Sequence, residues 1–217
     1  MAEGRQDAGD APKARDRRFA IAWHLAFAVM TAAGGGLLFT VGGLAPGAEL
    51  SALAAGLAAA LVGALLVATG GPSVRAATIL LWTLAGSSAA LMTGGIGGPL
   101  AAWCLAPLAA ATSFRRSDGL ALGAAAAVAA AAVATLGALF LVLPEAPAAA
   151  RVWLSLLSLA TVALGLGAGL ITVQGAAKRQ IRVSQRAALK AQIELDGQRD
   201  RERELERARA SAEAQNA

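Results

Sequence analysis

Few side chains in this sequence could carry chemistry, and they are far apart. His24 is the only histidine, and it stands inside a long apolar run. An ionisable side chain at such depth in an apolar layer is a candidate for ligand contact or for sensing protons. A neutral imidazole can also hydrogen-bond to a neighbouring helix. This structural role is the one that we favour for His24.

The second candidate site is a glycine-rich turn, Thr93-Gly-Gly-Ile-Gly-Gly-Pro99, which is followed by apolar residues, a tryptophan and Pro107. Glycine permits a positive φ, and proline stiffens the chain that re-enters the apolar layer. The turn is either a tight connection or a ligand-facing loop at membrane depth, which protein or a cavity must then cover. Together with His24, the candidate ligand residues are Gly94, Gly95, Pro99 and Trp103.

The sequence contains no recognisable catalytic motif. A phosphate-cradling glycine loop, a nucleophile elbow and the spacing of metal ligands are all missing. Cys104 is the single cysteine and lies in an apolar run, so we interpret it as a small core residue. From the residues themselves we expect no catalytic residue, no metal and no cofactor.

Composition indicates an integral membrane protein. The 217 residues are 57% hydrophobic and only 15% charged. The net charge of +5 would suggest nucleic acid as a partner for a soluble protein. Here the Lys and Arg residues stand at the ends of apolar runs, where membrane topology uses them. We therefore expect the lipid bilayer as a partner and no nucleic acid.

The predicted fold class is all-α: a bundle of six transmembrane helices followed by a long cytoplasmic helix or weak coiled coil. Residues 1–18 are expected to form a disordered cytoplasmic tail, residues 19–175 the transmembrane domain, and residues 176–217 a signalling helix. Turn signals separate the six predicted spans, which are 19–41, 50–69, 74–92, 100–113, 119–143 and 152–173.

The fourth predicted span is short, and Pro107 is expected to kink it. A re-entrant loop is the alternative. Charge favours six crossings, because Arg75, Arg115, Arg116 and the cluster at 178–190 then share one side with the N-terminal tail. The outer side carries only Glu49, Glu145 and Arg151. Both termini are therefore expected in the cytoplasm.

Small and aromatic residues predict how the helices pack. Gly165-x-Gly-x-Gly169 offers a small face, either for packing within one chain or for contact between two chains. Trp23, Trp103 and Trp153 are expected at the membrane interfaces as an aromatic belt, and Trp82 in the core.

The C-terminal segment carries a diluted heptad pattern. Ile181, Ala188, Leu195 and Leu205 are its apolar seam residues. Such a pattern predicts a marginal helix pair and hence a homodimer, with a single solvated helix as the alternative.

The glycine turn and the C-terminal helix together resemble the multi-span sensor region of bacterial sensor histidine kinases. One redox-sensing group of those kinases has Gly-Gly-x-x-Asn-Pro-Phe where this chain has Gly94-Gly-Ile-Gly-Gly98-Pro99-Leu100. Gly98 and Leu100 replace the Asn and the Phe. A quinone is the one ligand that this resemblance implies. The segment Arg207-Ala-Arg-Ala-Ser-Ala-Glu-Ala-Gln-Asn-Ala217 is similar to the helix that leads into their phosphoacceptor helix.

The resemblance implies a sensor and signal-transmission module of a two-component system in the bacterial inner membrane. Its sixth span would pass a conformational change into the dimerising helix. A response regulator would be reached only through a kinase part that lies outside this sequence. One alternative is the same module on another output, such as a cyclic-dinucleotide synthase. The other is a stand-alone scaffold or passive pore with a partner-recruiting helix.

Overall fold

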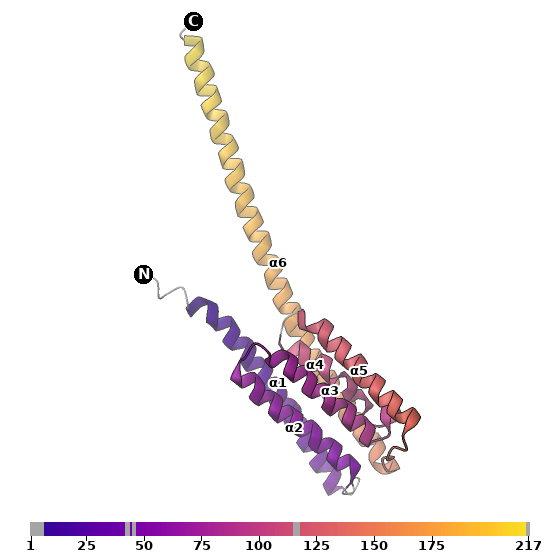
Figure 1. The fold of residues 1–217 in the computed structure, drawn as a ribbon. Helices are drawn as coiled ribbons and strands as arrows, with labels where there is room; N and C mark the ends of the chain where they lie inside the picture. The colour runs from indigo at the N-terminus through magenta and orange to yellow at the C-terminus, as the bar shows by residue number, and fades with distance from the viewer. Residues whose placement is uncertain (1–6, 42–43, 45–46, 115–117, 216–217) are drawn as a thin grey trace. The chain divides into compact units, whose positions relative to one another are not determined.

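A computed structural model describes residues 7–41, 44, 47–114 and 118–215. These residues form helices and short connections, without a strand among them. The all-α class predicted from the sequence is thereby confirmed. In chain order the elements are α1 (Asp7–Thr40), α2 (Ala48–Thr69), α3 (Val74–Met92), the 3-10 helices η2 (Gly95–Gly97) and η3 (Ala101–Leu105), α4 (Ala106–Ser113), α5 (Asp118–Phe140) and α6 (Ala148–Gln215) (Figure 1).

Five helical segments are long and apolar enough to cross a membrane. They are Ala14–Thr40, Ala48–Thr69, Val74–Met92, Gly119–Phe140 and Ala148–Arg203. Each exceeds or approaches the ~20 residues that a hydrocarbon layer about 30 Å thick requires. The positions of the long predicted spans follow from apolar runs that glycine and proline interrupt.

The fourth apolar segment, Ala101–Ser113, is shorter and changes geometry along its length. It begins as the 3-10 helix η3 and continues as α4. Pro107 lies in the first turn of α4, where its missing N–H leaves no helical hydrogen bond unmade. The expected kink at Pro107 is therefore replaced by a helix start.

The N-terminal part differs from the expected tail, because α1 already begins at Asp7. Lys13, Arg15, Arg17 and Arg18 favour helix, whereas Pro12, near the start of α1, lacks the N–H that would bond to the carbonyl four residues earlier. The first apolar span therefore continues from a charged helical segment.

The core is built around aromatic rings that pack against glycines and alanines. Trp82 and Trp103 are fully buried, and Trp23 and Phe27 are nearly so. The ring centroids of Phe27 and Trp82 are 4.5 Å apart, and those of Phe27 and Trp103 are 5.7 Å apart. The expected aromatic belt is thus wrong for Trp23 and Trp103. Trp153, which is 59% exposed, remains a candidate for it.

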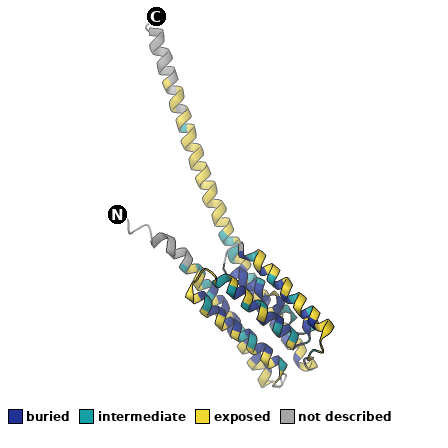
Figure 2. Cartoon of the chain, viewed as in Figure 1, coloured by how far each residue is buried: buried dark blue, intermediate teal, exposed yellow. Residues whose placement is uncertain are grey.

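The chain divides into two units, Met1–Val173 and Gln174–Ala217. The second unit consists of the C-terminal part of α6, and almost all its described side chains are exposed (Figure 2). Ile181, Leu195 and Leu205 expose 55%, 55% and 63% of their surfaces.

Candidate functional site

Two tryptophan side chains hold the membrane half of α6. The indole Nε1 of Trp23 in α1 donates a hydrogen bond of 3.0 Å to the carbonyl oxygen of Gly165. The Nε1 of Trp103 in η3 donates one of 3.0 Å to Thr161 Oγ1. Both bonds are buried, and an indole N–H has no water to bond inside a hydrocarbon layer. These bonds therefore fix α6 against two different elements.

A third bond joins α6 to the turn that precedes η3. Ser158 Oγ donates to the carbonyl oxygen of Pro99 over 2.8 Å, and both residues are buried. Ser158, Thr161 and Gly165 are spaced three and four residues apart, so they lie on one face of α6. We call these three residues the α6 contact face.

Glycines on α6 allow side chains of α1 and α4 to pack closely against it. A Cβ on Gly165 would lie 2.9 Å from Trp23 Cζ2, and a Cβ on Gly169 would overlap Thr112 Oγ1 of α4. At Gly167 no described atom lies within 4 Å of the position that a Cβ would take. The sequence left open whether these glycines pack within one chain or contact a second chain. Gly165 and Gly169 pack within the chain.

His24 lies inside the aromatic cluster and is fully buried. Its Nδ1 is 2.7 Å from the carbonyl oxygen of Ala20, which can only accept, so Nδ1 carries the proton. The ring is 4.9 Å from Trp23 and 6.1 Å from Trp82, centroid to centroid, and it packs against Gly63 of α2. Among the described residues, neither His24 Nε2 nor Trp82 Nε1 has a hydrogen-bond partner.

Different residues of the glycine turn contact different parts of the bundle. Gly94 and Gly95 have φ values of 110° and 71°, which glycine adopts without strain. Gly95 is buried against Ala134 and Ala138 of α5. The structure therefore brings Pro99, Trp103 and His24 into one region around the aromatic cluster and α6. Gly95 packs against α5, and Gly94 lies near Gly98 and Pro144, beyond the end of α5.

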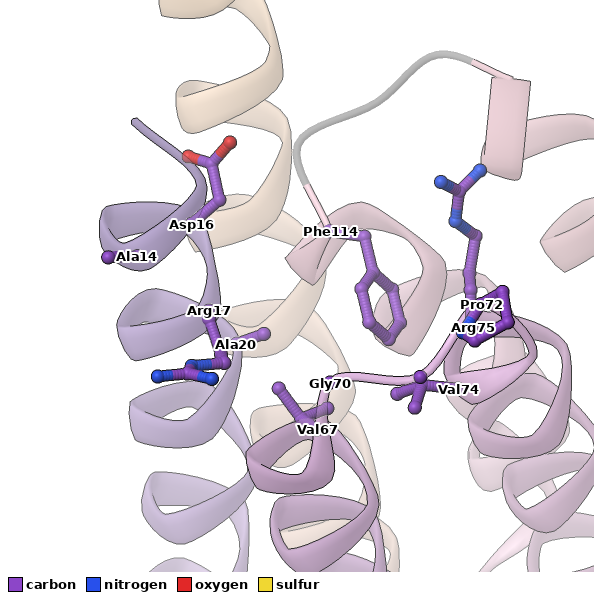
Figure 3. A pocket seen from close by; sticks show the side chains of 11 residues that line it. Ala14, Asp16, Arg17, Ala20, Val67, Gly70, Pro72, Val74, Arg75 and Phe114 are labelled. Carbon is purple, nitrogen blue, oxygen red and sulfur yellow. The ribbon is translucent and has the colours of Figure 1, made fainter. Parts of the chain in front are cut away.

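A cavity of about 510 Å³ opens where α1, the α2–α3 turn and the end of α4 meet (Figure 3). Its lining mixes apolar residues such as Val67 and Phe114 with Asp16, Arg17 and Arg75. No sequence pattern indicated this cavity, because its residues come from three separate stretches of the chain.

A groove of about 380 Å³ runs between α1 and the membrane half of α6. Its lining is apolar throughout and consists of Phe19, Ala22, Trp23, Ala26, Phe27, Met30, Leu164, Gly165 and Ala168. The α1 residues have helical spacing, which is the one sequence signal that could have indicated this face.

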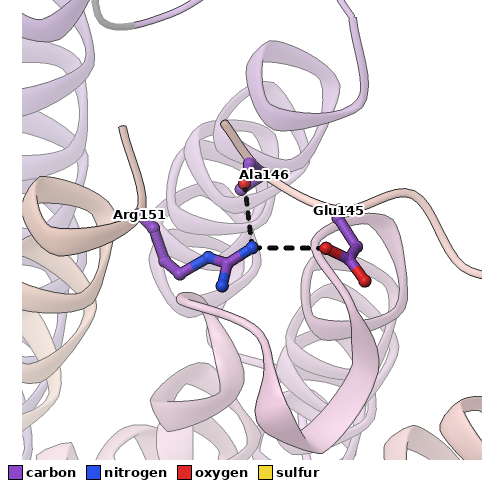
Figure 4. A network of polar contacts seen from close by, with 3 residues as sticks. All are labelled: Glu145, Ala146 and Arg151. Carbon is purple, nitrogen blue, oxygen red and sulfur yellow. Dashed lines mark hydrogen bonds and ion pairs between the residues drawn. The ribbon is translucent and has the colours of Figure 1, made fainter. Parts of the chain in front are cut away.

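One ion pair lies at the start of α6. Arg151 Nη2 is 3.4 Å from Glu145 Oε2 and donates to the carbonyl oxygen of Ala146 over 3.3 Å (Figure 4). Both side chains are largely exposed, so the pair adds little to stability. It does offset the charge of Arg151, the one cation predicted on the outer side.

Two other candidate chemistries gain no support from the described part of the chain. It contains no group of three or more His, Cys, Asp or Glu residues that could hold a metal ion. Cys104 is a buried free thiol in the bundle.

Comparison with known proteins identifies a relative. The histidine protein kinase DivJ of Caulobacter vibrioides is 42% identical to the chain over 122 residues. The chain is similar to a histidine kinase. The matched residues are 56% of this chain and 20% of DivJ, so the chain covers about a fifth of that protein. No family model and no solved structure matches the chain. The resemblance to sensor kinases predicted from the sequence is confirmed by this similarity.

Proposed function

We propose that this chain is the membrane sensor and signal-transmission part of a two-component sensor histidine kinase. The similarity to DivJ over more than half of the chain carries the proposal. The helices long enough to cross a membrane fit a membrane-bound sensor. The kinase reaction, and any contact with a response regulator, are not assigned to the described residues.

Signal transmission in this proposal depends on α6. The helix is uninterrupted from Ala148 to Gln215, so it includes both apolar residues of the bundle and the charged residues that follow Val173. Its contact face is hydrogen-bonded to α1, η3 and the Pro99 turn. A signal that changes these contacts would shift or rotate α6, as helix displacements do in other switching proteins.

We propose six crossings of the bacterial inner membrane, with η3 and α4 together as the fourth. Contacts with α6 support this assignment: Pro99 meets Ser158, and Thr112 meets Gly169. The eleven residues from 158 to 169 rise about 16 Å in a helix. Over that distance the fourth segment runs alongside α6 instead of turning back.

The packing around the glycine turn supports the same topology. Gly95 meets Leu143, close to the end of α5, and Gly119 at the start of α5 meets Arg75 at the start of α3. The start of α5 therefore lies beside the start of α3 and its end beside the end of α3, so the two helices are parallel, as a fourth segment that crosses between them requires. Both termini are then cytoplasmic, in keeping with the Lys and Arg residues of the inner segments.

We propose that the second unit pairs with a second copy of the chain. Ile181, Ala188 and Leu195 are exposed at heptad spacing, and Leu205 is exposed further along. A partner helix would cover this seam. The sensing role itself we assign to the region of Pro99 and Trp103, with Gly94 and Gly95 at the turn and His24 as a structural residue of the same cluster. A quinone is one ligand to test there.

A chimera tests the proposed function. Residues 1–217 would replace the similar segment of DivJ, and autophosphorylation with ATP would be measured in membranes. We expect an active kinase whose output responds to Thr161→Val, which removes the acceptor of the Trp103 indole. Loss of one interhelical bond, worth about 0.6 kcal/mol, corresponds to a change of about threefold.

Thr172→Val is the matched control for this chimera. Among the described residues its hydroxyl donates only to the carbonyl oxygen of Gly169, within α6, over 2.7 Å. We expect its output to equal that of the parent chimera. An inactive parent chimera at normal expression, or equal effects of the two threonine variants, would contradict the proposal.

A further inference from the structure

The groove between α1 and α6 lies entirely on segments assigned to the membrane. Six of its lining residues are on α1 at 19, 22, 23, 26, 27 and 30, which is one helix face about 16 Å long. Leu164, Gly165 and Ala168 form the opposite wall on α6. A groove on this surface is filled from the bilayer and not from water.

The groove offers no hydrogen bond to a polar occupant. Its one polar side-chain group, the indole N–H of Trp23, is already bonded to the carbonyl oxygen of Gly165. The remaining lining side chains are hydrocarbon, thioether or hydrogen. A linear hydrocarbon chain matches this long, apolar shape.

Positive charge lies at the water end of the same helix face. Arg15 and Arg18 precede Phe19 and Ala22 by four residues each, so they continue the face that lines the groove. Both arginines are exposed. Arginine side chains at a membrane surface attract anionic lipid headgroups and bind phosphate oxygens.

We propose that this groove binds an anionic phospholipid of the surrounding bilayer. One acyl chain lies between α1 and α6, against Trp23 and Gly165, and the phosphate group contacts Arg15 and Arg18. Because Trp23 bonds directly to the α6 contact face, the bound lipid reinforces one position of α6. The proposal goes beyond the kinase function and does not depend on it.

Native mass spectrometry of the full chain tests the site. Delipidated protein would be titrated with phosphatidylglycerol and with phosphatidylcholine of the same acyl chains. We expect one retained phosphatidylglycerol per chain, bound at least about tenfold more tightly than phosphatidylcholine.

A groove-filling variant separates this site from general lipid adhesion. Ala26→Phe places a ring into the groove from an exposed position of α1. Ala33→Phe is the matched control, since Ala33 is exposed two turns further along the same helix, beyond the groove lining. Displacing even two methylene groups should weaken binding about tenfold. We expect this loss for Ala26→Phe and none for Ala33→Phe.

A charge variant tests the headgroup contact without altering the packing. The double variant Arg15→Gln, Arg18→Gln should bring phosphatidylglycerol affinity close to that of phosphatidylcholine. Arg182→Gln, Arg186→Gln removes two exposed charges from the second unit and should leave the preference unchanged. Equal binding of the two lipids by the unaltered chain would overturn the proposal.

Two further outcomes would also overturn it. The first is the same affinity in Ala26→Phe as in the unaltered chain. The second is a disulfide-linked dimer of Ala26→Cys in a Cys104→Ser background, because the groove would then be a contact between two copies. The lipid readout is independent of kinase activity, so an inactive chimera with intact lipid preference would reject only the proposed function.

Discussion

Indole N–H groups explain why α6 is held where it is. An unbonded N–H inside hydrocarbon is costly, so an acceptor stabilises a buried tryptophan. Trp23 and Trp103 find theirs on the α6 contact face. Trp82 Nε1, in contrast, has no partner among the described residues. The same residue type therefore fills space in one position and fixes a helix in two others.

Trp103→Phe should destabilise the bundle. The variant loses the bond to Thr161 and leaves a cavity beside Gly56, so we expect a cost of about 1–3 kcal/mol in the free energy of unfolding. Unfolding in detergent, followed by circular dichroism, measures it. Trp153→Phe, at an exposed position, should cost less than about 0.5 kcal/mol. Equal costs for the two variants would show that burial of Trp103 does not matter.

His24→Gln should leave membrane insertion intact and alter chimera output little. Among the described residues the ring hydrogen-bonds only to Ala20, one turn earlier on the same helix, so its loss breaks no hydrogen bond between helices. Membrane fractionation and autophosphorylation at matched expression measure the two effects. A signal lost at normal expression would give His24 a direct sensing role.

At the scale of elements, glycine spacing decides which side of α6 faces the bundle. Gly165 and Gly169 contact Trp23 and Thr112, whereas Gly167 faces away from described atoms. The sequence indicated a small face here but left its partner open. Only the packed helices assign that partner to α1 and α4.

Gly169→Ala and Gly167→Ala form a matched pair on α6. In Gly169→Ala the new Cβ would overlap the Thr112 side chain, so we expect a loss of about 1–2 kcal/mol in the free energy of unfolding. The second meets no described atom and replaces glycine in a helix, so stability should stay equal or rise by up to about 1 kcal/mol. Denaturant titration in detergent compares them. The reverse order would contradict the α4–α6 packing.

Cysteine cross-linking tests pairing of the second unit. In a Cys104→Ser background, Ile181→Cys and Leu195→Cys should form disulfide-linked dimers in membranes, because the seam faces a second copy. Val183→Cys lies off the seam at a similar exposure, 63% against 55% for Ile181, and should cross-link far less. Equal cross-linking at 181 and 183 would favour a single solvated helix.

For the whole molecule, the fourth segment determines the topology. If η3 and α4 cross the membrane, Ile96→Cys and Glu145→Cys lie on the same side. In intact spheroplasts, with Cys104→Ser as background, both should react with a membrane-impermeant maleimide, and Gly71→Cys should not. Labelling of positions 96 and 145 from opposite sides would remove the fourth crossing and put the termini on opposite faces.

The helical class, the long apolar segments and the resemblance to sensor kinases could all be predicted from the sequence. These depend on composition, on glycine and proline breaks and on local motifs, which are all properties of neighbouring residues. The predicted bounds of the third span, 74–92, match those of α3, because Pro72 and the Gly94 turn end the apolar run on either side.

The contacts between distant residues could not be predicted and are seen only in the packed helices. Trp23 and Trp103 were expected at interfaces, because a tryptophan near a span end has the same sequence context whether it faces lipid or protein. The bonds from Trp23 to Gly165 and from Trp103 to Thr161 join residues 142 and 58 positions apart. No local pattern encodes such pairs. They depend on how glycine and alanine faces let separate helices approach one another.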